Sequence, residues 1–421
     1  MRGPAGAGGG GRPTDEWATD VAIVGGGPAG AVLAMRLART GRRVVVLERS
    51  PAWRWRACGV FSSPASVEAL RAAGVPPDLL GTTVRPIPAM RVEARSGAAF
   101  RLTYGDDGSL RAPAVGFDRS ALDPALLELA RSAGADVRTG STVVSVEPRR
   151  LVARPAAGRD SRPADRQIEV SARVIVGADG VRSTVARALD VARPAWIGPR
   201  TGLTFHVADP SPAAPRDARM VVLDDAYVGL APVPGGRVNV GIVLGGTWAG
   251  RLRREGAERV VGEVLRCVPR ASDDPVDWSA PERCERIEGI APLGHRVARR
   301  HGPDWLLVGD AAGFLDPFTG EGLHRALVSA SLAAAAIERH LDGVPGALAA
   351  YDRAVTRRFR SKDVLSLVVQ AFLGRPPLFD YAARRLASRD AVRETMGLVM
   401  GDLVPASRAL DPRLVAALLR P

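Results

Sequence analysis

Residues 25–30 (GGGPAG) have the residue types and the spacing that bind a phosphorylated dinucleotide. In a GxGxxG motif the first glycine permits a tight turn, the second lets the backbone approach a pyrophosphate, and the third lets a helix pack on a strand. The helix that follows would direct free N–H groups and a partial positive charge at the phosphates. The segment therefore predicts a pyrophosphate site at a strand-to-helix turn.

The elements around this motif are those that a dinucleotide site requires. Residues 18–24 are an apolar run, a helical pattern continues to Thr40, and residues 43–47 form a second apolar run that ends at Glu48. Together they predict one strand–helix–strand unit. Glu48 would accept hydrogen bonds from the ribose hydroxyls of an adenosine, and its charge would repel a 2′-phosphate.

Two later segments favour FAD over NAD. Residues 177–183 (GADGVRS) and 309–313 (GDAAG) each follow an apolar run with an aspartate beside glycine, which alone is typical of a helix cap. After the second of them, residues 316–322 (DPFTGEG) introduce a long Ala-rich helix. Backbone N–H groups at that helix start would stabilise negative charge on the pyrimidine edge of a reduced flavin. Asp310 would hold a ribityl hydroxyl.

In this order, the three segments resemble the class A flavoprotein monooxygenases and their relatives, the geranylgeranyl-reductase-like and flavin-halogenase branches. The resemblance spans roughly residues 18–340. It implies bound FAD, NAD(P)H as a transient reductant, and an arginine, Arg119, that reaches the FAD phosphate or ribityl region. The cofactor-binding residues expected on these grounds are Gly25, Gly27, Pro28, Ala29, Gly30, Glu48, Arg49, Arg119, Asp179, Gly180, Gly309, Asp310, Pro317, Gly320, Gly322 and Leu323.

The predicted fold is α/β: a Rossmann-type, glutathione-reductase-like FAD-binding domain with an inserted antiparallel β-sheet substrate domain and C-terminal helices. The inserted sheet is predicted because residues 200–245 alternate in a strand-like way between Pro/Gly turns. The expected organisation is a disordered tail at 1–16, FAD-binding segments at 17–195 and 291–345, a small substrate-side insertion near 66–115, a β-rich substrate domain at 196–290, and helices at 346–421.

Several chemistries fit these motifs. The Cys58-Gly59 pair matches a pair that geranylgeranyl-reductase-like members carry close to the flavin ring, although a buried thiol could simply pack. Residues 227–232 (YVGLAP) keep the Tyr and Pro of that branch's substrate motif and lack its two large apolar side chains, which argues against a long isoprenoid as substrate; the stretch more closely resembles oxidoreductases of aromatic and polyketide tailoring. The halogenase branch, which uses an active-site lysine, is disfavoured because the sole lysine of this chain, Lys362, lies in the C-terminal region.

The sequence therefore favours an NAD(P)H-dependent monooxygenase that uses molecular oxygen to hydroxylate a lipophilic or aromatic, polyketide-like small molecule. The alternatives are a flavin-dependent C=C reductase of the geranylgeranyl reductase type, and a protein that holds FAD without net redox chemistry, as a cyclase or structural element. Candidate catalytic residues are Cys58, Tyr227 and His324, with His206 as a further possible base. Each could instead be a structural side chain.

Composition bears on nucleic-acid binding, metal sites, disulfides and membrane spans. The formal charge is +13, but the basic side chains are almost all arginine, without runs interleaved with aromatic residues, so we expect a solvated basic surface and no nucleic-acid partner. Three cysteines without metal-ligand spacing predict neither a disulfide framework nor a metal site, and they fit a cytoplasmic protein. The longest apolar stretches are too short for a transmembrane segment, and the Gly/Pro-rich start is not a signal peptide.

Overall fold

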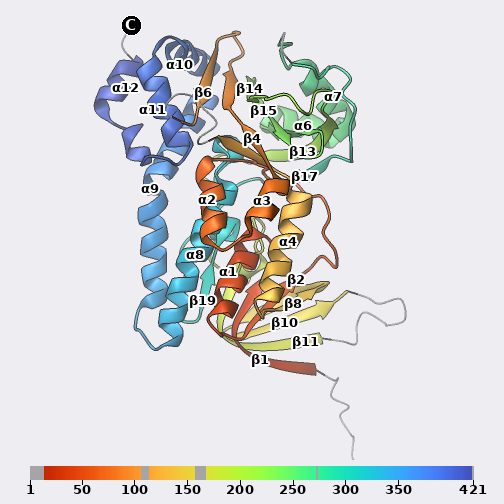
Figure 1. Ribbon diagram of the computed structural model, residues 1–421, viewed down its shortest axis with the longest axis vertical. Helices are drawn as coiled ribbons and strands as arrows, with labels where there is room; N and C mark the ends of the chain where they lie inside the picture. The colour runs from red at the N-terminus through yellow and green to blue at the C-terminus, as the bar shows by residue number, and fades with distance from the viewer. Residues whose placement is uncertain (1–13, 106–112, 157–166, 272–273, 420–421) are drawn as a thin grey trace, which may run out of the picture.

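The computed structural model describes residues 14–105, 113–156, 167–271 and 274–419. Its first layer is a seven-stranded sheet in the order β8-β2-β1-β11-β10-β9, with β19 beside the end of β11 (Figure 1). Only β9 and β10 run antiparallel to their neighbours. The strands are β1 (Thr14–Val24), β2 (Val44–Glu48), β8 (Asp136–Thr139), β9 (Ser141–Glu147), β10 (Arg150–Pro155), β11 (Gln167–Gly177) and β19 (Trp305–Leu307).

The parallel part of this sheet is buried on both faces, as its uninterrupted apolar strands require. Alternate residues of β1 enter two different cores: Val21 and Ile23 pack with the helices, whereas Ala22 and Val24 face the other side. The helices α1 (Pro28–Arg39), α4 (Arg119–Ser132) and α8 (Gly322–Leu341) cover the first face (Figure 1). The short helix α5 (Thr184–Ala188) contributes to the core on the second face.

A second seven-stranded sheet lies beyond the first layer, in the order β17-β13-β16-β15-β14-β5-β6 (Figure 1). Its pairs are antiparallel except for β14 with β5. Helices α6 (Gly246–Glu255) and α7 (Ala257–Arg266) lie against one face. The strands are β5 (Ala89–Glu93), β6 (Ala99–Thr103), β13 (Thr201–Ala208), β14 (Ala218–Leu223), β15 (Ala226–Val233), β16 (Arg237–Leu244) and β17 (Glu288–Ile290).

Smaller elements connect the two sheets. A three-stranded sheet, β3-β7-β4, follows the nucleotide-binding turn, and a two-stranded sheet, β12-β18, lies in sequence between residues 177–183 and residues 309–313. These elements and their helices are β3 (Phe61–Ser62), α2 (Pro64–Ala72), α3 (Pro77–Thr83), β4 (Val84–Ile87), β7 (Ala114–Phe117), β12 (Ala192–Pro194), β18 (His295–Val297), and the 3₁₀ turns η1 (Gly309–Ala312) and η2 (Pro317–Thr319).

The C-terminal helices form a separate layer on the second sheet. The long helix α9 (Ala347–Leu373) runs beside α8 and continues to the second sheet, where α10 (Pro376–Ser388), α11 (Asp390–Met400), η3 (Ala406–Arg408) and α12 (Pro412–Leu419) follow (Figure 1). Side chains of α10 and α11 pack with β5 and β6 in one core. Within the described ranges, no helix combines the length and the apolar character needed to cross a bilayer.

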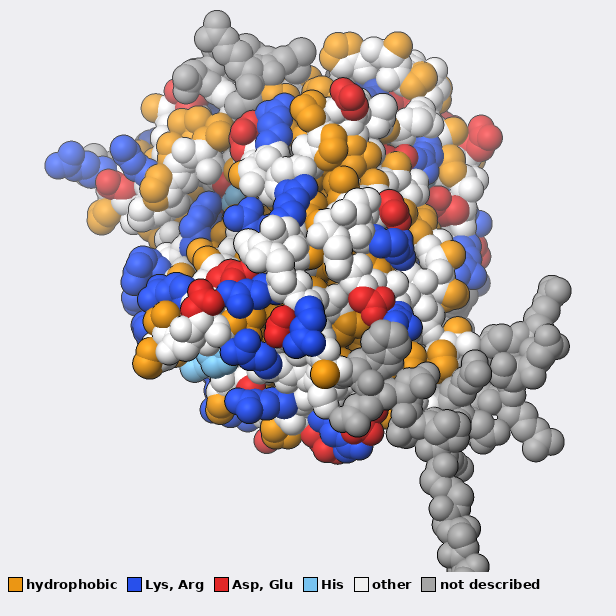
Figure 2. All heavy atoms as spheres, turned by 60° about the horizontal axis from the view of Figure 1, so that its bottom comes forward, with side chains coloured by type: hydrophobic (Ala, Val, Ile, Leu, Met, Phe, Trp, Pro, Cys, Tyr) orange, Lys and Arg blue, Asp and Glu red, His pale blue; other side chains and the backbone are white. Residues whose placement is uncertain are grey.

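The fold class predicted from the sequence is confirmed, with differences at element level. β1 begins at Thr14, so the last three residues of the expected tail belong to a strand, while residues 1–13 lie outside the described ranges. β5 and β6, expected in a separate small insertion, pair with β14 in the second sheet. On the face shown in Figure 2, arginine side chains are interspersed with acidic ones.

Candidate active site

A cavity of about 240 Å³ lies where β1, β2, β11 and β19 end; we call it the nucleotide cavity. This is the edge at which open α/β sheets bind ligands. Eleven of the predicted cofactor residues contribute to its lining. They are Gly25, Gly27, Pro28, Ala29, Glu48, Arg49, Asp179, Gly180, Gly309, Asp310 and Gly322.

The glycines of the GxGxxG motif have three distinct roles. Gly25 has a φ of +105°, and an added Cβ would lie 2.5 Å from the carbonyl oxygen of Ala178. A Cβ on Gly30 would lie 2.0 Å from the carbonyl oxygen of Gly25, so helix α1 packs directly on the turn. A Cβ on Gly27 would meet nothing within 4 Å. Gly27 therefore faces the space that a pyrophosphate would fill at the N-terminus of α1.

Glu48 is oriented by backbone donors. Its Oε2 accepts from the N–H of Gly26 at 2.8 Å, and its Oε1 accepts from the N–H of Ser50 at 2.9 Å. The residue is 7% exposed, at the cavity wall. Because each carboxylate oxygen can accept more than one hydrogen bond, Glu48 keeps capacity for ribose hydroxyls. The motif reading missed the contribution of Gly26, whose N–H fixes this carboxylate.

Asp179 carries a polar atom that the protein leaves without a partner. Its Oδ2 accepts from the N–H of Thr184 at 2.6 Å, whereas its buried Oδ1 has no partner among the described residues. Burial raises the pKa of this carboxyl. An unsatisfied buried oxygen on a cavity wall is expected where a ligand hydroxyl or N–H completes the site. Together with the open space at Gly27, it fits a bound FAD.

Asp310 lies where the nucleotide cavity meets a second one. Burial raises the pKa of its carboxyl to about 6, although Arg119 and Arg325 lie close enough to lower it. It follows β19 in η1, and the N–H of Gly309 is held by the Ser329 hydroxyl at 2.9 Å. This position suits a carboxyl that accepts a hydrogen bond from a ribityl hydroxyl, as the sequence predicts.

The second cavity, which we call the central cavity, has a volume of about 220 Å³. Asp310 and Gly322 line both it and the nucleotide cavity. Pro317, Gly320 and Leu323, predicted to cradle the flavin, line it as well. The start of α8 thus faces this space, where backbone N–H groups can stabilise negative charge on a ligand.

A buried ion network holds the start of α8. Glu321 precedes the helix and accepts from the Lys362 ammonium at 2.9 Å and from Arg325 at 3.2 Å. Lys362 also pairs with Asp402 at 3.1 Å, and Asp402 accepts from the Ser63 hydroxyl at 2.9 Å. The sole lysine of the chain therefore ties α8 to α9, to the turn after α11 and to the start of α2.

Tyr227 lines the central cavity, as predicted, and belongs to a hydrogen-bonded chain. Its hydroxyl donates to Asp316 Oδ1 at 2.5 Å, and Arg200 donates to Asp316 Oδ2 at 3.0 Å. Burial raises the pKa of the Tyr227 phenol well above its usual value, and the Asp316 charge adds to this effect. Tyr227 therefore keeps its proton near neutral pH. Asp316 and Arg200 were not identified from the sequence, although Asp316 opens the DPFTGEG segment.

Cys58 also lines the central cavity, and burial raises the pKa of its thiol, so it remains protonated. Arg119 lies beneath it and does not line either cavity. The guanidinium forms two hydrogen bonds with Asp123, at 2.6 and 2.9 Å, and donates to the carbonyl of Gly59 at 2.7 Å. Arg119 is held by Asp123 and the carbonyl of Gly59 and lies close enough to Asp310 for their charges to interact, so its contact with the cofactor stays a prediction.

Neither histidine candidate reaches the central cavity. His324 packs against α9, where Arg358 lies 3.2 Å from its Nε2 and the Phe359 ring meets it edge-on. His206 packs against Trp55 with the two rings tilted by 52°, and its Nδ1 is hydrogen-bonded to Glu285 at 2.6 Å. Burial lowers the pKa of both rings. The prediction of His324 as a catalytic residue is therefore not supported by its placement; one residue after Leu323, the helix has turned its side chain away from the cavity.

A third cavity, of about 330 Å³, separates the second sheet from the C-terminal helices; we call it the apolar cavity. Its wall combines side chains of β5, β6 and β14 with side chains of α9–α12, and only Tyr104 and Thr319 bring polar side-chain atoms to it. Phe61, Met90, Met220 and Phe318 line both the apolar and the central cavity. No motif in the sequence indicates this cavity.

Comparisons with known proteins agree with this geometry. A family model described as an FAD binding domain matches residues 18–365. A menaquinone reductase of Mycolicibacterium smegmatis is 29% identical over 327 residues, 75% of each chain. A digeranylgeranylglycerophospholipid reductase 2 of Methanopyrus kandleri is 29% identical over 333 residues, also 75% of each. The structure of a geranylgeranyl bacteriochlorophyll reductase-like protein from Thermoplasma acidophilum has a TM-score of 0.72 at 21% identity, covering 96% of this chain and 99% of that one.

Proposed function

This chain belongs to the FAD binding domain family, and we propose that, like relatives named as reductases, it reduces a carbon–carbon double bond in a long, isoprenoid-type lipid. The observation that carries the proposal is the apolar cavity beside the central one. A reacting double bond would lie in the central cavity, and the rest of the hydrocarbon chain would extend past Phe61 and Phe318 into the apolar cavity.

The sequence favours a monooxygenase over a C=C reductase, whereas the apolar cavity supports the reductase. An oxygenase acting on a compact aromatic molecule needs the central cavity alone. A space of about 330 Å³ with no charged side chain in its wall is within the size range of ligand sites and suits an aliphatic chain. Burying such a chain is favourable by roughly 0.8 kcal/mol per methylene. Names of the curated relatives, which include reductases of a menaquinone and of a digeranylgeranylglycerophospholipid, support the same substrate class.

The bound flavin would supply the two electrons, as a hydride, and the protein would supply orientation and a proton. Two protonated groups line the central cavity: the Tyr227 hydroxyl, hydrogen-bonded to Asp316, and the Cys58 thiol. Either can donate the proton that completes the reduction of the double bond. The start of α8 would stabilise negative charge on the reduced cofactor. NAD(P)H is the proposed source of electrons.

The test follows the mass of the product. The FAD-loaded protein would be incubated with NADPH and a polyprenyl quinone under heavy-isotope oxygen, with an anaerobic dithionite-reduced sample in parallel. After the headgroup of the product has been reoxidised to the quinone, we expect two added hydrogens in its polyprenyl chain and no labelled oxygen in both samples. A product that gains one labelled oxygen, and forms only when oxygen is present, would refute the reductase.

A monooxygenase is the second candidate. It is favoured by the Tyr227–Asp316 pair, which could orient a phenolic hydroxyl at the central cavity. For this candidate, labelled oxygen would enter an aromatic substrate, and filling the apolar cavity would leave turnover unchanged.

A further inference from the structure

Exposed apolar side chains concentrate on the C-terminal helices. Six large apolar side chains are exposed among the described residues, and four of them lie in this region: Val364, Val368, Leu403 and Val415, at 36–42%. In α12, none of the described side chains of residues 412–417 is fully buried, although four of these six residues are Leu, Val or Ala. These side chains are apolar at exposed positions of the C-terminal helices, where the solvated face of a helix is ordinarily polar.

The apolar cavity opens on this same surface. Val368 of α9 and Val415 of α12 are both exposed, at 41% and 36%, and both line the cavity. Side chains that belong at once to a cavity wall and to the molecular surface mark an opening. The opening therefore lies between the end of α9 and α12. A hydrocarbon chain could pass through it without crossing a polar layer.

Arginines flank the apolar surface on α9. The outer face of this helix carries Arg353, Arg357 and Arg360, then Val364, Val368 and Ala371, and Arg375 follows just after the helix ends at Leu373; all are exposed and three or four residues apart. Within the described ranges these four arginines form no ion pair with another side chain. No described acidic side chain therefore offsets their charge by direct pairing.

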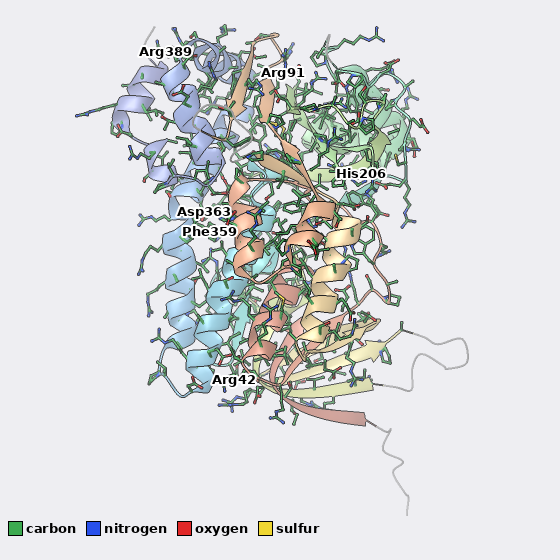
Figure 3. All side chains as sticks on the ribbon, viewed as in Figure 1. Arg42, Arg91, His206, Phe359, Asp363 and Arg389 are labelled. Atoms are coloured by element: carbon green, nitrogen blue, oxygen red, sulfur yellow. The ribbon has the colours of Figure 1, made fainter. Side chains whose placement is uncertain are left out.

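The opposite face of α9 is directed at the FAD-binding domain. Phe359 lies under Arg325 of α8, and Asp363 pairs with Arg325 at 2.6 Å (Figure 3). Because α9 runs along the edge of the molecule (Figure 1) and turns Phe359 and Asp363 to α8, its exposed arginines and valines face away from the protein. Residues 347–417 contain twelve basic and seven acidic side chains, so the whole helical layer has an excess of positive charge.

We propose that this surface docks on an anionic lipid bilayer. Arginines beside an apolar strip match the chemistry of a bilayer interface, where phosphate groups meet acyl chains. The valines and Leu403 would enter the interface, the arginines would contact lipid phosphates, and the opening between α9 and α12 would face the acyl region. The substrate would then reach the apolar cavity from the bilayer. Only this last point rests on the proposed function; docking itself does not.

Vesicle flotation of the FAD-loaded protein tests the proposal. Vesicles of phosphatidylcholine with phosphatidylglycerol would be compared with pure phosphatidylcholine vesicles. We expect binding to the anionic vesicles that weakens in high salt. The Arg357→Gln/Arg360→Gln variant should weaken binding by about fivefold per arginine, from ~1 kcal/mol of attraction each. Val364→Asn/Leu403→Asn should weaken it several-fold, and neither residue lines a cavity.

Matched control variants remove exposed arginine and valine side chains from surfaces outside the C-terminal helices. Arg253→Gln/Arg254→Gln removes two exposed arginines from α6, which packs on the opposite face of the second sheet. Val144→Asn changes a valine of β9 that is 41% exposed, like Val364. Both controls should bind vesicles like the unchanged protein. All variants should reduce a detergent-dispersed substrate at the original rate, because their changes lie outside the cavities.

The proposal is overturned if anionic vesicles fail to float the protein, or if the controls lose as much binding as the α9 variants. It is also overturned if the α9 variants only abolish self-association, because the surface would then bind a second copy of the chain. Flotation needs no turnover, so its result is independent of whether the protein proves to be a reductase.

Discussion

At the scale of single residues, the site contains groups that the protein has fixed and groups that it has left open. Both oxygens of Glu48 accept backbone hydrogen bonds, and Arg119 forms three hydrogen bonds, two with Asp123 and one with the carbonyl of Gly59. In contrast, Asp179 Oδ1 has no partner among the described residues and Gly27 faces open space. The open groups are those that a ligand would complete.

Two alanine substitutions should separate cofactor binding from folding. Gly27→Ala adds a methyl group that meets nothing within 4 Å at an ordinary φ of −69°, so the protein should fold with unchanged stability but lose FAD. Gly30→Ala places a methyl group 2.0 Å from a carbonyl oxygen and should destabilise the domain itself. Flavin absorbance and thermal unfolding of the FAD-free proteins measure the two effects. Equal loss of stability in both variants would contradict this assignment.

Replacing Asp310 by Asn should have opposite effects on the stability of the FAD-free protein and on its affinity for FAD. Its pKa is about 6 in the folded protein against an ordinary 3.8, so between these pH values the folded state binds more protons than the unfolded state. The free energy of unfolding therefore falls as pH rises through this window. Without FAD, Asp310→Asn should be more stable than the original by about 1–3 kcal/mol at neutral pH. The difference should vanish below the ordinary pKa.

The measurement for Asp310→Asn is urea unfolding of the FAD-free proteins across this pH range, with FAD affinity determined in parallel. If Asp310 accepts a ribityl hydroxyl as predicted, FAD affinity should fall, because the neutral amide oxygen of Asn is a weaker acceptor than a carboxylate. A stability difference that does not depend on pH would show that the effect is not due to titration of Asp310.

Removal of the Tyr227 hydroxyl should affect turnover more than folding. Tyr227→Phe leaves Asp316 its contacts with Arg200 and with the N–H of Phe318, so the expected loss is about 1 kcal/mol of stability. If Tyr227 donates the proton, substrate reduction should slow by roughly 10²-fold or more while FAD stays bound. Tyr351→Phe is the control, because its buried hydroxyl donates to a backbone carbonyl outside the cavities. It should lose similar stability and no activity.

At the scale of elements, the start of α8 depends on residues far along the chain. Lys362 lies between Glu321 and Asp402, and its side chain is 3% exposed. Lys362→Met would leave both carboxylates buried with less compensation and should destabilise the protein by about 3–5 kcal/mol. Arg42→Met removes two surface ion pairs and should cost only ~0–1 kcal/mol. Denaturant unfolding compares them, and similar losses would show that the Lys362 network is not a major support.

The elements that carry motifs were predictable from local sequence. Residues 25–30 specify both a turn and its flanking strand and helix, and the confirmed fold class rests on such segments. Residues 226–233, in contrast, resemble a substrate motif in sequence, whereas in the structure they form β15, which pairs with both β14 and β16. The placement of β5 beside β14 was not predictable, because pairing over more than a hundred residues leaves no local pattern.

His324 shows the same limit for a site residue. Its position near the motif suggested the cavity, but its direction depends on the phase of α8, which turns about 100° per residue. The ion network of Lys362 and the apolar cavity also bring together segments that are distant in sequence. Periodicity predicts that a residue is buried, and only the assembled fold determines what it is buried against.

At the scale of the whole molecule, the three cavities form a series across both layers. The first sheet provides the nucleotide cavity, the junction of the sheets provides the central cavity, and the C-terminal helices close the apolar cavity against the second sheet. The C-terminal layer therefore lies where substrate size would be decided. The predicted cofactor residues and the residues of the C-terminal helices that line the apolar cavity belong to different layers and can be changed separately.

This separation predicts that the C-terminal helices set the accepted chain length. Ala383 of α10 is 1% exposed and lines the apolar cavity only. Ala383→Phe should shorten the space, raise the KM for long-chain substrates by ~10-fold or more, and leave short-chain substrates unaffected. Phe372→Ala enlarges the same cavity and should not impair long chains. Steady-state kinetics over a series of substrate chain lengths measures the KM of both variants. A shortened cavity would impair long substrates and spare short ones. An equal loss of activity at every chain length in Ala383→Phe would instead indicate a damaged fold and contradict the prediction.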